Sequence, residues 1–189
     1  MTVAKASGEH PIDVMYLLHK ALNAGASRTV SLAERLAVGD SLHPFRHAFE
    51  RWEQTLTFHA EQEDRYMTPL LPASALARDN EQSHRGLAHR MAEIRTYLQE
   101  IGEEAVTPRI RRRLFGHAVA LRIAQEDHLE EEEDLVLPII RERLSAAQQC
   151  EIVQRLLRDP QAADPTWVVT WLRHALTETE RHAVAALAA

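Results

Sequence analysis

Four stretches of this sequence, similar in length, carry apolar residues at helical spacing, and short segments with Gly or Pro separate them. They span about residues 12–38, 41–69, 77–104 and 108–138. The 189 residues include only 6 Gly and 8 Pro, and 5% are aromatic, so long uninterrupted helices are easier to build than a many-turned β-sandwich. Four helices joined by short loops predict an all-α fold in which the helices pack as an antiparallel bundle.

The last part of the chain, residues 144–189, is expected to be a helical extension that packs on the bundle or on a partner. Residues 144–157 are predicted to form a short helix, 159–165 a turn-rich break, and 167–187 a further amphipathic helix. Pro138 is expected to bend or end the fourth helix, because proline lacks the amide that bonds back one turn. Trp167 and Trp171 indicate an interaction surface with two alternatives, a cap on the bundle or a homodimer contact through this helix.

Two segments repeat one pattern: a histidine, a glutamate four residues later, and a proline six residues after the glutamate. They are His59, Glu63 and Pro69 in one segment, and His128, Glu132 and Pro138 in the other. Residues four apart on a helix are neighbours about 5–6 Å apart on one face, so each segment offers half of a metal site. Glu131 is an alternative to Glu132, since a spacing of three residues also keeps one face.

The other two predicted helices each place one histidine on an apolar stripe, His19 and His84. A single histidine there is usually a core residue. Burying four imidazoles and two carboxylates together is costly unless something pairs them, and a cationic metal pair is the economical partner. This ligand set suits iron, manganese or zinc, and two glutamates in a bundle core are suited to bridging two ions.

Other polar residues near this pattern have simpler interpretations. Most of the acidic run after His128 is expected to be a solvated face, including Glu130, Glu133 and Asp134. Tyr66 and Gln125 lie three residues from the predicted site, and their spacing suits plain core positions as well as partners of the ligands, with the core position favoured.

These residues resemble the hemerythrin-like, HHE cation-binding family, in its variant with four His and two Glu, over about residues 11–143. The resemblance implies an up-down-up-down four-helix bundle and a non-haem di-iron centre, in which an oxo or hydroxo bridge joins two iron ions. Carried over residue by residue, it implies the metal ligands His19, His59, Glu63, His84, His128 and Glu132, with the two glutamates bridging. Oxygen-carrying members have a second histidine where this chain has Ala88, and an aspartate where it has Glu133.

The function implied by the resemblance follows from counting ligands. Four histidines, two bridging carboxylates and a solvent-derived bridge fill about ten of roughly twelve octahedral positions, which leaves about two open. We therefore expect a protein that binds or reacts with a small oxidant, namely dioxygen, peroxide or nitric oxide, as a sensor, a scavenger or a redox protein. The alternatives are a metal-poor helical interaction module and an iron storage or buffering protein. Whether the chain is an enzyme stays open, because a sensor and a catalyst share such ligands.

Charge and cysteine content bear on partners and location. With a formal net charge of -6, the chain is not expected to bind nucleic acid or an acidic membrane surface, because both partners are themselves negatively charged. No stretch approaches the roughly 18 consecutive apolar residues of a membrane span. The single cysteine, Cys150, cannot form an internal disulfide, and residues 1–11 lack the layout of a secretory signal, so a cytoplasmic location is expected.

Overall fold

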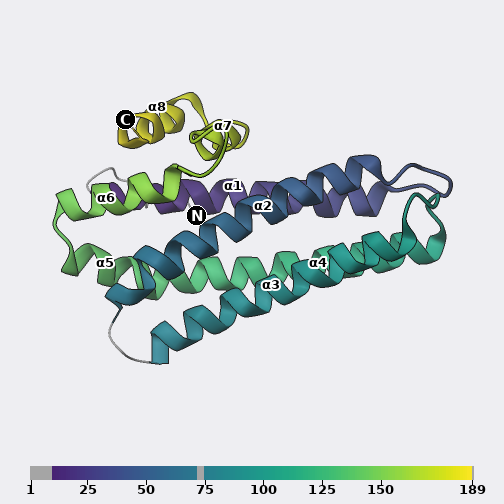
Figure 1. The fold of residues 1–189 in the computed structure, drawn as a ribbon, viewed down its shortest axis with the longest axis horizontal. Coiled ribbons are helices and arrows are strands. Elements are labelled where there is room, and N and C mark those ends of the chain that lie inside the picture. The colour runs from purple at the N-terminus through teal and green to yellow at the C-terminus, as the bar shows by residue number, and fades with distance from the viewer. Residues whose placement is uncertain (1–9, 72–74, 189) are drawn as a thin grey trace.

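The computed structural model describes residues 10–71 and 75–188, and these parts of the chain are helical with no strand among them. The all-α prediction is therefore confirmed. The expectation about a secretory signal concerns residues 1–11, and residues 1–9 of that segment lie outside the described part. Four long helices form the bundle in Figure 1: α1 (Val14–Arg35), α2 (His43–Tyr66), α3 (Ala75–Ile101) and α4 (Pro108–Glu131). Helix α1 packs against α2 and α4, and α3 packs against α2 and α4, as four neighbours around one core must.

Local signals in the sequence start and end these helices. A 3₁₀ turn, Pro11–Asp13, leads into α1. Thr107 accepts a hydrogen bond from the amide of Ile110 at 3.2 Å, which satisfies one free donor at the start of α4. Gly39, with a φ of 91°, turns the chain after α1 in a conformation that side-chain-bearing residues rarely adopt. Its amide donates to Val106 at 2.8 Å, so the loops at this end of the bundle are joined.

The fourth helix does not end at Pro138, which corrects one of the two outcomes expected there. A π-helix, Glu132–Val136, follows α4 directly, and α5 (Leu137–Arg143) continues beyond it. The amide of Leu137 donates to the carbonyl of Glu132, five residues back, and Pro138 lies in the first turn of α5. Because proline has no amide to donate, the helical hydrogen bonding is interrupted at Pro138, directly after the point where the π-helix passes into α5.

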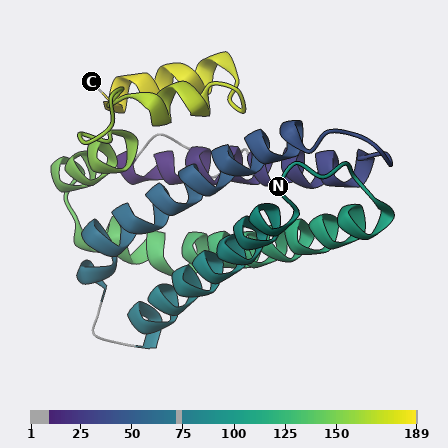
Figure 2. The ribbon, with the colours of Figure 1, turned by 45° about the vertical axis from the view of Figure 1, so that its right-hand side comes forward.

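The expected single helix over residues 167–187 is wrong, because the structure has two helices there. Helix α6 (Ala146–Leu157) is followed by α7 (Trp167–Leu172) and α8 (Glu178–Ala188). Thr177 and Glu180 exchange hydrogen bonds between side chain and backbone, which is the capping box that begins a new helix. Figures 1 and 2 show α7 and α8 lying over α1 and α2.

The buried apolar residues form two clusters, one toward each end of the bundle. The first cluster lies toward the joined loops and includes Leu22, Phe49, Leu87 and Leu114; the second includes Ala21, Phe58, Val136 and Leu172. Residues of α6, α7 and α8 belong to the second cluster, so these helices pack on the bundle of their own chain. No helix in the described ranges is both long and apolar enough to cross a bilayer.

Candidate metal centre

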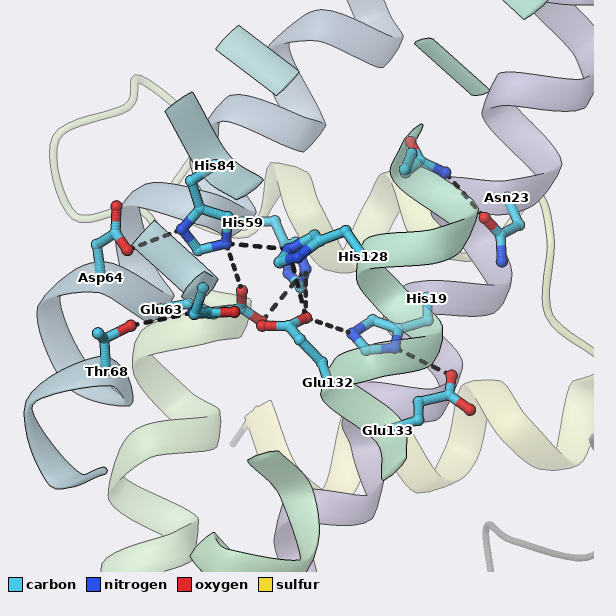
Figure 3. Close-up of polar contacts among 12 residues, drawn as sticks. His19, Asn23, His59, Glu63, Asp64, Thr68, His84, His128, Glu132 and Glu133 are labelled. Atoms are coloured by element: carbon cyan, nitrogen blue, oxygen red, sulfur yellow. Dashed lines mark hydrogen bonds and ion pairs between the residues drawn. The ribbon is translucent and has the colours of Figure 1, made fainter. Parts of the chain in front are cut away.

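A layer of polar side chains crosses the bundle where the two apolar clusters meet. Each long helix passes from one cluster to the other near a residue of this layer; on α1, His19 lies between Leu18 of the second cluster and Leu22 of the first. All six side chains that the sequence singled out lie in this layer and are at most 6% exposed: His19, His59, Glu63, His84, His128 and Glu132. Figure 3 shows them converging.

The six side chains form two groups of potential ligands. One group holds His19 and His59, and the other holds His84 and His128, while Glu63 and Glu132 belong to both. Within each group, one ligand atom from every residue lies within 4.8 Å of the others. The distance from His59 Nε2 to Glu63 Oε1 is 3.2 Å, and that from His84 Nε2 to Glu63 Oε2 is 3.3 Å. Two histidines and two shared carboxylates per group are a suitable arrangement for two neighbouring cations.

Many polar atoms of this layer have no hydrogen-bond partner among the described residues. They are Nε2 of His19, both ring nitrogens of His59, and both carboxylate oxygens of Glu63 and of Glu132. Buried polar atoms are almost always hydrogen-bonded, and each one left alone costs about 1–3 kcal/mol. Nε2 of His84 and Nε2 of His128 face each other at 3.0 Å, a hydrogen bond that requires one of the two nitrogens to carry a proton and so to give up its lone pair. Two bound cations would pair with the carboxylate oxygens of both glutamates and with one nitrogen of each ring, which leaves only the second nitrogen of His59 without a partner among the described residues, so the residues present fit a metal centre.

Two acidic residues outside the layer orient its histidines. Nδ1 of His84 lies 2.7 Å from Oδ1 of Asp64, and Nδ1 of His19 lies 3.0 Å from Oε1 of Glu133. A carboxylate accepts, so in each ring Nδ1 carries the proton and Nε2 keeps its lone pair for a metal. Neither role was predicted from the sequence: Asp64 is not among the predicted site residues, and Glu133 was expected on a solvated face. The signal was the acidic residue directly after each predicted glutamate ligand.

Burial sets the protonation of this layer when no cation is present. It lowers the pKa of His59, and it lowers the pKa of His128 to about 4, so both rings are neutral at pH 7. Burial and the nearby Glu132 carboxylate raise the pKa of Glu63 well above its usual range. Burial also acts to raise the pKa of Glu132, but interactions with His59, His128 and His19 outweigh it and hold that pKa below its usual range. Neutral imidazoles are the form that binds a metal, whereas Glu63 must lose its proton.

The structure also shows where the other residues that the sequence analysis weighed near the site lie. Glu131 is exposed, and Glu132 is the carboxylate that lies in the layer. Gln125 is buried outside both ligand groups, where it accepts from Trp52 Nε1 at 2.6 Å and donates to Asn23 at 2.8 Å. Tyr66 is half-buried, with the guanidinium of Arg155 above its ring.

The two C-terminal tryptophans pack on their own chain. The ring of Trp167 meets that of Phe58 edge-to-face with centroids 5.4 Å apart, and Trp171 packs against the first apolar cluster. Position 88, where oxygen-carrying members have a second histidine, is an exposed alanine on α3. A metal ligand from that position is therefore not available in this chain.

Comparison with known proteins gave one match. The model of the hemerythrin HHE cation-binding domain matches residues 10–140, which include the four long helices and all six side chains of the polar layer. No curated protein and no solved structure was found that matches the chain significantly.

Proposed function

Because this chain belongs to the hemerythrin HHE cation-binding family, we propose that its buried polar layer holds two iron ions and that the protein binds or reacts with a small oxidant. The oxidant is dioxygen, peroxide or nitric oxide, and the role is that of a sensor, a scavenger or a redox protein. One observation carries the proposal: two groups of potential ligands share both of their carboxylates. A single-ion site needs no such sharing, whereas a pair of cations does.

The residues divide between the two ions. His19 and His59 would hold one ion, His84 and His128 the other, and Glu63 and Glu132 would contribute to both. Histidine nitrogen with carboxylate oxygen suits iron, and the family supports that choice of metal. A pair of irons with open positions supplies two-electron chemistry with small oxidants.

The protein's own residues prepare this layer for a cation. Burial keeps His59 and His128 neutral, and Asp64 and Glu133 hold the rings of His84 and His19 with Nε2 directed inward. The apolar clusters on both sides exclude bulk water, which strengthens electrostatic interactions inside the layer. The layer is thus shaped for cations before they bind, and a small molecule is the size of reactant that such a buried site admits.

We assign the metal-binding unit to residues 11–143 and treat residues 144–189 as an extension that covers one side of it. The single cysteine, Cys150, agrees with a reducing compartment, and we propose the cytoplasm as the location. A homodimer through Trp167 and Trp171 stays a prediction, since both rings already contact their own chain.

The deciding experiment measures iron per chain after anaerobic reconstitution with ferrous iron, together with absorption spectra before and after addition of oxygen, peroxide or nitric oxide. We expect about two irons per chain and spectra that respond to at least one oxidant. His84→Ala should lose iron, while His89→Ala, an exposed histidine on the same helix, should not. If the protein takes up no stoichiometric iron, the alternative function of a helical interaction module is favoured. If iron is held weakly and its spectrum does not respond to any of the oxidants, an iron storage or buffering protein is favoured.

A further inference from the structure

A cleft of about 760 Å³ lies where the C-terminal segment crosses α1 and α2, away from the polar layer. None of the six proposed metal ligands lines it. Figures 1 and 2 show α7 next to α1 and α2 at this place. The volume falls within the roughly 300–1,000 Å³ that small-molecule sites occupy.

The walls of the cleft are aromatic. All three tryptophans of the chain line it, with Trp52 on α2 and Trp167 and Trp171 on α7. The Nε1 of Trp52 already donates to Gln125, and that of Trp167 donates to Asp159 at 3.1 Å. Trp52 is 1% exposed, so the aromatic surface that an occupant would meet belongs to Trp167 and Trp171, and Trp167 presents its apolar ring rather than its donor. Trp171 packs close to α1, because a Cβ atom at Gly25 would lie 3.5 Å from its ring, and Ala24 beside Gly25 also lines the cleft.

The rim of the cleft is basic although the whole chain is acidic. Five groups that are cationic or become so on protonation line it: Arg28, Arg51, His43, His47 and His174. Asp164 is the one acidic residue in the lining, and the backbone amide and hydroxyl of Thr166 donate to its carboxylate. The side chain of Arg28 makes no hydrogen bond or ion pair with any residue of the described ranges. An arginine beside an aromatic wall, in a chain of net charge -6, is suited to an organic anion.

We propose that this cleft binds an aromatic carboxylate, with the ring system against Trp167 and Trp171 and the carboxylate paired with Arg28 and Arg51. The apolar walls favour a flat hydrophobic body, and the two guanidiniums favour a planar anion over a neutral group. The inference does not depend on iron, since the cleft and the polar layer share no residue.

The test uses the tryptophans as the reporter. The probe is N-phenylanthranilate, and its neutral amide has nearly the same shape without the charge. We expect the acid to quench tryptophan emission saturably and to bind at least about tenfold more tightly than the amide. Equal affinity for acid and amide, or no saturable quenching by the acid, would overturn the proposal.

Variants locate the binding. Arg28→Gln and Arg51→Gln should each raise the dissociation constant about tenfold, and Ala24→Leu should raise it by filling the cleft. Arg90→Gln, an exposed arginine on α3 outside the cleft, is the matched control and should leave it unchanged. Circular dichroism and thermal unfolding establish that each variant is folded. Folded Arg28→Gln and Arg51→Gln variants that bind the acid as tightly as the wild-type protein would contradict the assignment.

Discussion

The carboxylate of Asp64 on α2 lies 2.7 Å from Nδ1 of His84 on α3, so one helix orients a proposed metal ligand of its neighbour. Glu133 does the same for His19 from the opposite pair of helices, at 3.0 Å. Each of these acids directly follows a glutamate of the polar layer. In each pair, the glutamate faces Nε2 of the histidine and the following acid faces Nδ1 of the same ring. The two halves of the site thus repeat one arrangement.

Asp64→Ala should weaken metal binding about 10- to 100-fold, because His84 loses the acceptor that keeps its Nδ1 protonated and its ring in place. Competition with a chelator of known affinity measures the change. Glu61→Ala, another exposed acid of α2, is the matched control and should bind as tightly as the wild-type protein. A similar loss in both variants would mean that general negative charge, rather than contact with His84, matters.

Glu133→Ala should likewise lower the affinity for iron about 10- to 100-fold through His19. Glu131→Ala serves as the comparison, because Glu131 lies two residues away and is exposed. Iron titration of both variants decides between them. A larger loss of iron affinity in Glu131→Ala than in Glu133→Ala would mean that Glu133 is not the acid that orients His19.

Glu63→Gln should lose iron and yet stabilise the metal-free protein at neutral pH. The folded-state pKa of Glu63 is raised above the usual value near 4.5, so the stability that its protonated form contributes is present below pH 4.5 and is lost as pH rises through the folded-state pKa. Glutamine stays neutral at every pH, so the variant does not lose this stability as the pH rises. The metal-free variant should therefore unfold at a higher temperature than the metal-free wild-type protein at neutral pH.

Thermal unfolding of chelator-treated wild-type protein and of the Glu63→Gln variant, compared at pH 5 and pH 8, measures this effect. The difference between the two should grow from pH 5 to pH 8. A constant difference would show that Glu63 does not titrate differently in the folded and unfolded states.

Gln125→Leu should destabilise the fold by about 1–3 kcal/mol while leaving iron content unchanged. The substitution leaves the buried Nε1 of Trp52 without its acceptor, but it removes no residue of either ligand group. Urea unfolding and iron analysis of the same preparation give both numbers. Loss of iron at full stability would instead make Gln125 a partner of the metal ligands.

Helical periodicity was enough to predict the bundle, since each long helix buries one apolar stripe and the loops are short. The four-residue spacing from His59 to Glu63 likewise predicted that both would share a face, and the structure brings them to 3.2 Å. The roles of Asp64 and Glu133 were not predicted, because each residue lies one position after a predicted glutamate ligand and so off the helix face that carries the His and Glu pattern. Their partners are on other helices, and the periodicity of a single helix carries no information about such contacts.

The break between α7 and α8 was missed for a different reason. Apolar residues keep helical spacing across residues 172–176, and this pattern masked the start signal at Thr177 and Glu180. The π-helix was also missed, because an extra residue within a helix changes hydrogen bonding without changing composition. Both departures depend on which backbone groups pair, and apolar periodicity says little about that.

The polar layer also bears on how the chain opens. The layer divides the apolar core into two clusters. Without a cation, many of its polar atoms have no hydrogen-bond partner among the described residues, so few interactions across the layer connect the stability of one cluster to that of the other. The metal-free protein should then behave as two cooperative units, so that amide hydrogen exchange in α1 proceeds at different rates before and after His19. Bound ions would tie both units to the same six side chains, and exchange on both sides would slow to a common rate set by global unfolding.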